Sequence, residues 1–416
     1  MQLHVPTILL VLISSTASAA DWPQYRGPAW DGKSQETIGE VAWPKSGPKV
    51  IWKQPAALGF SSFAVAGGRA FTLVAEKNSK GALSQTVVAL DAATGKEQWR
   101  YAMSRSKYQG GGDAGARDNQ GGDGPRTTPT VDGDRVYVYD SKLKLACLNA
   151  VTGKLVWRHN IRKDFGGRNV TWDNAMAPVI DGDSLFIVGG GRGQSVLAFN
   201  KQTGEEIWKS GDEKMTHATP MLATIQSKRQ LVCFLRPGLV AYDVSDGTEL
   251  WRTAYPFNVS TAAMPVVVRD LVYCSAGYGV GAGLFRITPD LRVEDVWQKT
   301  NELMNHWSTP VLLDGHLYGI YGVKKYGKAP LQCVELATGQ IKWKQAGYGP
   351  GNCILAGDKL VVLTDTGELT VVAATPASYQ ELARADVLEG KCWSTPALVD
   401  GRVYLRSTKE AACVEL

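Results

Sequence analysis

Apolar and polar positions alternate in four short segments of one block of the chain, between residues 126 and 157. The segments are rich in β-branched and aromatic residues and occupy positions 128–131, 135–139, 144–148 and 154–157. An Asp-Gly pair at 132–133 and a Thr-Gly pair at 152–153 separate segments, and such pairs favour tight hairpin turns. The pattern therefore predicts a four-stranded antiparallel unit.

The end of this block recurs along the chain: an acidic residue or Asn, a glycine four positions later, and a tryptophan four positions after the glycine. The full motif ends at Trp99, Trp157, Trp208, Trp251 and Trp343, a degenerate copy ends at Trp297, and a copy without tryptophan lies near Leu382. Trp52 lies in an isolated segment that resembles the same strand. First-strand prolines from Pro178 to Pro396 are spaced by 42 to 45 residues, with Cys353 in place of one of them. A period in the forties with four strands per unit predicts propeller blades.

Eight copies of the outer strand predict an eight-bladed ring. Lys49–Lys53 resembles an outer strand with no blade before it, whereas residues 394–416 supply only three strands. We expect the N-terminal strand to complete the last blade, because this closes the ring and removes exposed strand edges. The predicted fold is all-β, with a single eight-bladed β-propeller over residues 49–416 after an irregular lead-in at 20–48.

Residues 1–19 resemble a secretory signal peptide, with a short apolar run from Ile8 to Ile13 and a cleavage pattern at Ala17-Ser18-Ala19. The residue directly after that site is not a cysteine, so a lipid anchor is not expected. No later apolar run is long enough to span a bilayer, so a transmembrane segment is not expected either. We expect a monomeric protein that is periplasmic or secreted.

Composition narrows the function classes. A formal net charge of +5, with basic residues scattered along the chain, is not typical of a nucleic-acid-binding protein.

Seven cysteines are an odd number, so at least one is unpaired within the chain. We expect Cys147, Cys333 and Cys413, at one position of three blades, to be small buried core residues. The blade tryptophans are expected to be structural, each packing one large ring between blades.

The first-strand proline sets a register for the candidate site. The residue three positions before it, and its neighbours, should lie at the rim of the central channel. The candidate ligand-binding residues are Arg126, Trp172, Asn174, His217, His306, Trp307, Asn352 and Trp393. Such a polar and aromatic funnel suits a small polar molecule or an extended peptide. Asp173 is the acidic residue expected there, as a candidate general base, but the sequence assigns no catalytic set.

Several chemistries lack their sequence signatures. The glycine-rich loops precede strands, whereas a dinucleotide-binding fingerprint must open a helix. No Gly-x-Ser-x-Gly elbow and no Cys-x-x-Cys pair occur. The Gly-rich connection at 101–125 contains Asp113, Asp118, Asn119 and Asp123, which offer oxygen atoms to Ca²⁺, but their spacing fits no EF-hand. No metal site is assigned.

The repeat, with its Thr-Gly turn, tryptophan and x-Thr-Pro strand start, resembles the pyrroloquinoline-quinone-type (PQQ-like) propeller repeat. The segments Asp21–Pro28 and Gly390–Pro396 resemble a BamB-like group of exported bacterial propeller proteins. The resemblance implies the eight-bladed fold. It also implies two functions, because the superfamily includes calcium-dependent quinoprotein alcohol dehydrogenases and the assembly protein BamB, which binds no cofactor.

Our leading hypothesis is a non-catalytic propeller that binds a protein segment or a small polar ligand at the channel rim. The alternative is an alcohol dehydrogenase, or a polyvinyl-alcohol-type dehydrogenase, with PQQ and Ca²⁺ as cofactors. The larger enzymes of that class use two adjacent cysteines against the quinone, and this sequence contains no adjacent pair. A third hypothesis, a glycan-handling protein, follows from the tryptophans and amides of the funnel.

Overall fold

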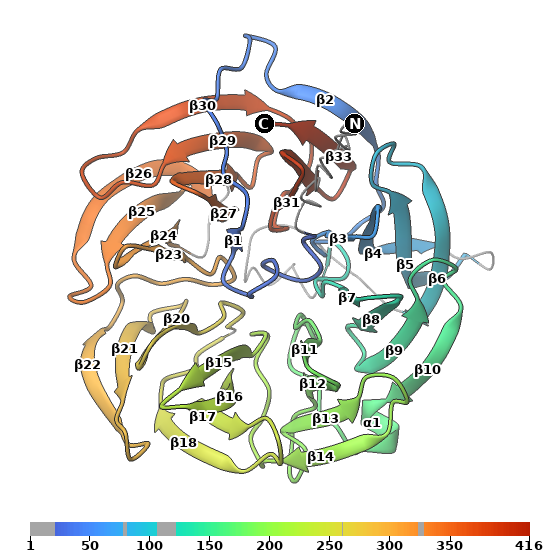
Figure 1. Ribbon diagram of the computed structural model, residues 1–416, viewed down its shortest axis with the longest axis vertical. Coiled ribbons are helices and arrows are strands. Elements are labelled where there is room, and N and C mark those ends of the chain that lie inside the picture. Colours follow the sequence, from blue (N-terminus) through green and yellow to red (C-terminus); the bar gives the residue numbers. More distant parts are fainter. Residues whose placement is uncertain (1–20, 78–80, 106–121, 260, 323–327) are drawn as a thin grey trace, which may run out of the picture.

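The computed structural model describes residues 21–77, 81–105, 122–259, 261–322 and 328–416. Eight sheets are arranged as a ring around a central axis, with short strands inside and long strands outside (Figure 1). Within the described residues the only α-helix is α1 (Ile161–Asp164). The predicted all-β, eight-bladed propeller is confirmed.

Each blade runs from an inner to an outer strand. Blade 1 consists of β3 (Ala64–Ala66), β4 (Arg69–Lys77), β5 (Leu83–Asp91) and β6 (Glu97–Arg105). Blade 2 consists of β7 (Thr130–Asp132), β8 (Arg135–Tyr139), β9 (Lys144–Asn149) and β10 (Leu155–Asn160). Blade 3 consists of β11 (Val179–Asp181), β12 (Ser184–Val188), β13 (Val196–Asn200) and β14 (Glu206–Ser210). Blade 4 consists of β15 (Met221–Ile225), β16 (Lys228–Phe234), β17 (Gly238–Asp243) and β18 (Glu249–Ala254).

The second half of the ring repeats the arrangement. Blade 5 consists of β19 (Val266–Val268), β20 (Leu271–Ala276), β21 (Gly281–Ile287) and β22 (Val293–Lys299). Blade 6 consists of β23 (Val311–Leu313), β24 (His316–Ile320), β25 (Ala329–Glu335) and β26 (Ile341–Gly349). Blade 7 consists of β27 (Asn352–Ala356), β28 (Lys359–Leu363), β29 (Glu368–Ala373) and β30 (Glu381–Asp386). Blade 8 consists of β31 (Ala397–Val399), β32 (Arg402–Arg406), β33 (Glu410–Glu415) and, as its outer strand, β2 (Lys49–Pro55).

One cross-strand row explains the repeated tryptophan. In blade 2, Tyr137 on β8 pairs with Cys147 on β9, and Cys147 pairs with Trp157 on β10. The small central residue leaves room for the two rings, whose centroids lie 6.0 Å apart. The register shifts just before Trp157, so a β-bulge sets the position of the ring on the outer strand.

Each tryptophan then contacts the next blade. The Trp99 indole Nε1 of blade 1 donates to the Ala150 carbonyl of blade 2 over 3.0 Å, beside the Thr-Gly turn. A Cβ on Gly153 would lie 2.6 Å from the Trp99 ring, so the turn glycine leaves space for the preceding blade's indole. The same donation to the next blade occurs from Trp52, Trp157, Trp208, Trp297 and Trp343. Trp251 differs, because its Nε1 donates to the Gln230 side chain within its own blade.

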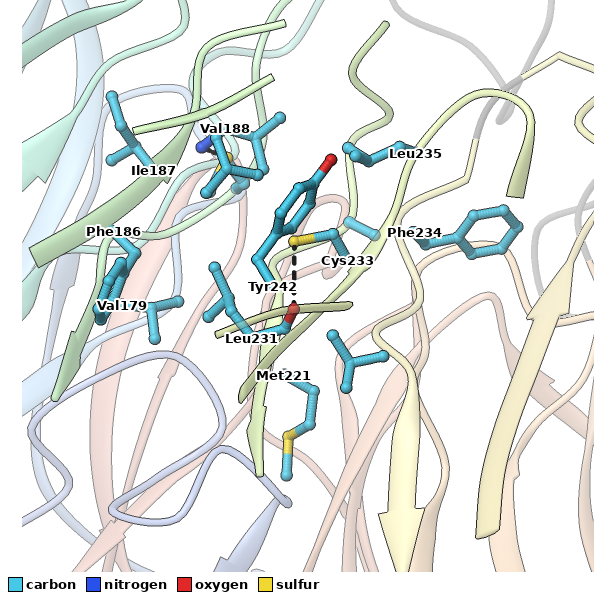
Figure 2. Packing of buried hydrophobic residues seen from close by; sticks show 14 of the residues in the cluster. Val179, Phe186, Ile187, Val188, Met221, Leu231, Cys233, Phe234, Leu235 and Tyr242 are labelled. Atoms are coloured by element: carbon cyan, nitrogen blue, oxygen red, sulfur yellow. Dashed lines mark hydrogen bonds between the residues drawn. The ribbon is translucent and has the colours of Figure 1, made fainter. Parts of the chain in front are cut away.

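The hydrophobic core lies between adjacent blades. Figure 2 shows one such interface, where Phe186 and Val188 lie on the side of β12 that faces Leu231 and Tyr242 of blade 4. All seven cysteines are buried in this core and free of disulfides. Burial raises the pKa of the Cys353 thiol to about 12, so it stays protonated at neutral pH.

The predicted ring closure is confirmed. The N-terminal strand β2 pairs antiparallel with β33, with Trp52 opposite Cys413. The fully buried Arg406 of blade 8 reaches towards blade 1 and donates to the carbonyls of Leu73 and Ala57 over 2.8 and 2.7 Å, and to the Thr72 hydroxyl over 3.0 Å. The seam inside blade 8 is therefore closed by backbone pairing, and a buried cation links this blade to blade 1.

The lead-in contributes more structure than its irregular sequence indicates. Its short strand β1 (Lys33–Ser34) pairs parallel with β27 of blade 7. Trp22 pairs with Val65 of blade 1, and Arg26 donates to the carbonyls of Thr309 and Pro310 in front of β23. These contacts place the lead-in across the inner strands, at the centre of the ring in Figure 1.

The described part of the chain contains no helix that is long and apolar enough to cross a membrane.

Candidate functional site

A cavity of about 110 Å³ lies on the axis of the ring, where the residues that precede or begin the inner strands of all eight blades converge. The lining residues are Tyr25, Phe60, Ser62, Arg126, Trp172, Ala175, His217, Thr219, Ala262, His306, Trp307, Asn352, Trp393 and Thr395. Seven of the eight candidate ligand-binding residues are among them. Asn174 is the exception.

The register explains which residues the repeat identified. Five lining residues each lie three positions before the proline that directly precedes an inner strand. They are Arg126, Ala175, Ala262, Trp307 and Trp393. Phe60 holds the same position in blade 1. The repeat did not identify it, because blade 1 has Phe63 in place of the marker proline. The position of Phe63, just before the alternating strand Ala64–Ala66, was the signal that could have found it.

Tyr25 is the second lining residue for which the repeat gave no signal. It comes from the lead-in, which lies outside the blade period. Burial raises the pKa of this phenol, so Tyr25 is neutral at physiological pH. The lead-in thus supplies one aromatic residue and one hydroxyl group to the cavity.

Aromatic side chains form a continuous arc along one side of the cavity. The rings of His306 and Trp307 have centroids 4.6 Å apart, as do those of Trp307 and Trp393. Trp393 in turn stacks on Phe60 at 4.6 Å, with an interplanar angle of 27°. Tyr278 extends the arc, with its ring centroid 5.2 Å from that of His306. Because the rings support one another, the arc is held in place without a bound molecule.

Two cations flank this aromatic arc. The Arg126 guanidinium lies 5.6 Å from the Phe60 ring centroid and donates to the carbonyls of Gly122 and Gly124 over 3.2 and 3.4 Å. The Lys391 ammonium lies 4.7 Å from the Trp393 ring centroid and forms an ion pair with Asp123. Arg126 and Lys391 thus place two positive charges beside the aromatic arc, and Asp123 lies against the second of them.

The two histidines of the cavity are uncharged. Burial, with the positive charge of Arg126, lowers the pKa of His217 to about 4, and burial, with His217, lowers that of His306 to about 3. The His217 Nε2 atom lies 2.8 Å from the Thr171 carbonyl oxygen. That nitrogen must therefore carry the proton and donate, which leaves Nδ1 as an acceptor.

Trp172 enters the cavity from a tightly anchored loop between blades 2 and 3. Trp172 and Asp173 both have left-handed backbones, with φ of 68° and 67°, which is costly for residues other than glycine. The Asp173 carboxylate accepts from the Lys142 ammonium over 2.5 Å and from the Asn169 amide over 3.1 Å. Asp173, the candidate general base, does not line the cavity, because these contacts hold its carboxylate outside it.

Asn174 stabilises the same loop through hydrogen bonds to the backbone. Its side chain is 1% exposed, and its Nδ2 donates to the carbonyls of Tyr139 and Asp140 over 3.4 and 3.3 Å. Its Oδ1 accepts from the Met176 backbone nitrogen over 3.1 Å. The amide therefore positions the loop and is not presented to a ligand.

Two buried polar atoms of the lining have no hydrogen-bond partner within the described residues. They are Nε1 of Trp307, which is a donor, and Nδ1 of His217, which is an acceptor. Leaving a buried polar group unpaired costs about 1–3 kcal/mol. Both atoms are buried, so a molecule in the cavity would reach them only if the side chains moved.

The described lining has no carboxylate, and the described residues contain no cluster of three His, Cys, Asp or Glu side chains that could hold a metal ion. Ca²⁺ is normally bound by six to eight oxygen atoms that include Asp or Glu carboxylates. The lining therefore does not fit a calcium ion. Asp113, Asp118 and Asn119 lie outside the described residues, and Asp123 is engaged by Lys391.

A family model described as "Outer membrane protein assembly factor BamB" matches residues 39–190 and 83–345, which together make up more than half of the chain. The protein belongs to this family of PQQ-like propellers, and the resemblance drawn from the repeat is confirmed. A search of curated proteins finds no match to the chain.

Solved structures agree with this assignment at the level of the fold. BamB from Moraxella catarrhalis is 14% identical, with a TM-score of 0.62 over 89% of this chain and 100% of that one. Quinohemoprotein alcohol dehydrogenase from Comamonas testosteroni is 14% identical, with a TM-score of 0.66 over 94% of this chain and 80% of that one. The quinohemoprotein alcohol dehydrogenase ADHIIG from Pseudomonas putida is 12% identical, with a TM-score of 0.61 over 95% and 80% of the two chains.

Proposed function

We propose that the protein is an exported propeller that binds a small polar ligand or a protein segment in the axial cavity, without performing chemistry there. The observation that carries this proposal is the convergence of all eight blades on one cavity with aromatic walls and a few polar side chains. Apolar surface combined with a few polar groups of fixed position is the usual character of a binding pocket.

The electrostatics of the cavity support binding rather than catalysis. A general base works best with a pKa near the operating pH. His217 and His306, with pKa values of about 4 and 3, are weak bases at neutral pH. The described lining offers no carboxylate in their place.

The family supports the protein-segment form of the proposal, because its description names an assembly factor. Export is inferred from the predicted signal peptide at residues 1–19, which lies outside the described residues. An exported binding protein of this kind would meet its partner or ligand outside the cytoplasm.

The test compares the mature protein with a Trp307→Ala variant in two screens, thermal shift with a library of small polar metabolites and selection from a displayed peptide library. We expect at least one binder whose Kd rises by 10-fold or more in Trp307→Ala, because this ring is central to the aromatic arc. Leu382→Ala, an exposed position on β30, is the matched control and should leave that Kd unchanged. Binders that are all insensitive to Trp307→Ala would contradict the proposal.

The second candidate, a quinoprotein dehydrogenase, is favoured by the structural likeness to the quinohemoprotein alcohol dehydrogenases, which covers nearly the whole chain. Against it, the described lining does not fit the Ca²⁺ that the superfamily implies, because it offers no carboxylate. Calorimetric titration with PQQ, with and without Ca²⁺, separates the candidates. Micromolar, Ca²⁺-dependent binding, about −8 kcal/mol, would establish the dehydrogenase, and absence of binding would leave the non-catalytic proposal standing.

A further inference from the structure

The lead-in separates the axial cavity from a second hollow of the ring. Tyr25 lines the axial cavity, whereas the next residue, Arg26, lines a hollow bounded by β15, β19 and β23. Because two consecutive residues of one segment line the two hollows, this segment lies between them. The axial cavity therefore has the lead-in as its floor.

This floor is fixed to inner strands on different sides of the axis, and it crosses the centre of the ring in Figure 1. Trp22 exchanges backbone hydrogen bonds with Val65 of blade 1 over 2.8 and 2.7 Å. On the other side, Arg26 donates to the carbonyls of Thr309 and Pro310 over 2.7 and 3.0 Å, and β1 pairs with β27 of blade 7. A bound molecule must therefore enter and leave by the face on which the inner strands begin, and a polypeptide cannot be threaded through the ring.

Only part of the lining is accessible to such a molecule. The Ser, Thr, Asn and His residues of the lining are each 8% exposed or less. The partly exposed lining residues are Tyr25, Arg126, Trp172, Ala175, Ala262 and Trp307. Since all of these except Arg126 present an aromatic ring or a methyl group, the accessible surface is mainly apolar.

The three accessible rings come from three parts of the fold. Tyr25 belongs to the lead-in, Trp172 to the loop between blades 2 and 3, and Trp307 to the segment before β23 of blade 6. The Trp172 loop is anchored by the ion pair of Asp173 with Lys142. The accessible rings are thus positioned before any ligand arrives, and they can contact both the faces and the edge of a flat group.

The size of the cavity limits that group to one ring. Its volume of about 110 Å³ is close to the ~150 Å³ of an apolar protein cavity that holds one benzene ring. A single benzene-sized ring therefore matches the cavity in size and in the apolar character of its accessible walls.

Partly exposed aromatic residues continue from the cavity to the rim around its entrance. Tyr278, in the loop between β20 and β21, has its ring centroid 5.2 Å from that of His306 and lies outside the lining. Phe257 lies in the same connection between blades 4 and 5 as the lining residue Ala262, with the Arg236 guanidinium 3.7 Å from its ring centroid. A free ring in the cavity would not reach these residues, whereas a polypeptide that carries the ring would cross the rim.

Building on the function proposed above, we propose that the axial cavity is a blind pocket for one aromatic side chain, of the size of phenylalanine, from a partner polypeptide that lies across the rim. The side chain enters from the face on which the inner strands begin. Its ring contacts Trp172 and Trp307, and its tip stops at Tyr25.

The test is calorimetry on the mature protein with a blocked pentapeptide that carries phenylalanine between two glycines on each side. Matched peptides carry alanine, serine or 2-naphthylalanine at the central position. We expect the phenylalanine peptide to bind about 10-fold more tightly than the alanine and serine peptides, and Trp172→Ala and Trp307→Ala each to weaken it by about 10-fold. Val151→Ala, an exposed residue in a turn of blade 2, is the control and should leave its Kd unchanged. Equal binding of the phenylalanine and serine peptides would overturn the proposal.

A Tyr25→Ala variant tests the floor. The substitution deepens the cavity, so the ratio of the affinities for the 2-naphthylalanine and phenylalanine peptides should rise by about 10-fold. This ratio does not depend on how much of the variant is folded, because both peptides bind the same folded fraction. An unchanged ratio would show that the ring does not stop at Tyr25 and would overturn the blind pocket.

Toluene, the free ring of the phenylalanine side chain, distinguishes the two sources of the ring. In saturation-transfer NMR we expect it to bind about 10-fold more weakly than the phenylalanine peptide, because it makes no contact with the rim. Equal or tighter binding of toluene would overturn the polypeptide partner in favour of a free aromatic molecule. If neither binds while another ligand binds in a Trp307-dependent manner, the aromatic inference is wrong and the binding function stands. If no molecule shows Trp307-dependent binding, both proposals fail.

Discussion

At the scale of single residues, burial decides the chemistry of the cavity. His217 and His306 would be partly charged in water near pH 6.5, yet both are held neutral by an apolar surrounding and by the nearby Arg126 charge. A neutral imidazole can accept a hydrogen bond at Nδ1, whereas the protonated ring only donates. Both histidines of the cavity therefore stay uncharged over the whole physiological pH range.

The depressed pKa values predict how stability depends on pH. Between pH 6.5 and about 4 the unfolded chain binds protons at these histidines and the native protein does not, so the free energy of unfolding falls as the pH is lowered. From pH 7 to pH 5 each histidine should contribute a loss of roughly 2 kcal/mol. Urea unfolding at the two pH values measures the total change.

A His217→Gln, His306→Gln double variant provides the control, because glutamine keeps hydrogen-bonding capacity and does not titrate. Its loss of stability between pH 7 and pH 5 should be smaller than that of the native protein by roughly 4 kcal/mol. Equal losses in the two proteins would show that the histidines are not held neutral.

At the scale of the structural element, the Thr-Gly turn and the tryptophan form one joint between blades. Gly153 has φ of 68°, and a Cβ there would lie 2.6 Å from the Trp99 ring of the preceding blade. Gly133, in the Asp-Gly turn of the same blade, has φ of 55° and open space around its Cβ position. Both glycines thus have a left-handed backbone, but only Gly153 also lies against the ring of a neighbouring blade.

This difference makes a matched prediction. Gly133→Ala should lower the free energy of unfolding by about 1–2 kcal/mol, the cost of a left-handed alanine. Gly153→Ala should lower it by a further ~1–3 kcal/mol, because the methyl group displaces the Trp99 ring. Chemical denaturation of both variants measures the difference. Equal effects would mean that the indole moves aside without cost.

The periodic elements could be predicted from the sequence because every blade needs the same tight turns and the same packing against its neighbour. The turn glycine, the outer tryptophan and the inner proline recur, and together they determined the blade count, the closing strand and the cavity register. Departures from the period could not be predicted in this way. Tyr25 belongs to the lead-in, Phe60 precedes Phe63 where the other blades have the marker proline, and Asn174 turns its amide to backbone carbonyls although its position points to the rim.

At the scale of the whole molecule, the closed ring has one seam, which lies inside blade 8 where the last strand β33 pairs with the N-terminal strand β2. The chain runs on from β2 into β3 of blade 1, and the Arg406 side chain adds a second link between these two blades. Burial lowers the pKa of Arg406 to about 10, so it remains a cation at neutral pH, and its charge is stabilised by carbonyl oxygens. The junction between blades 8 and 1 thus contains one buried cation with partners in blade 1.

Substitution of this group should weaken the ring at one place. Arg406→Met keeps the length and the apolar packing of the side chain but leaves the carbonyls of Leu73 and Ala57 without their donor. We expect a loss of about 2–4 kcal/mol in the free energy of unfolding, with faster hydrogen exchange in β4 and β32 than in the blades across the ring. Arg402→Met, at a partly exposed position on the same strand, should change stability by less than about 0.5 kcal/mol. Uniformly faster exchange in all eight blades would show that the ring unfolds as one cooperative unit and that the junction between blades 8 and 1 is no weaker than the others.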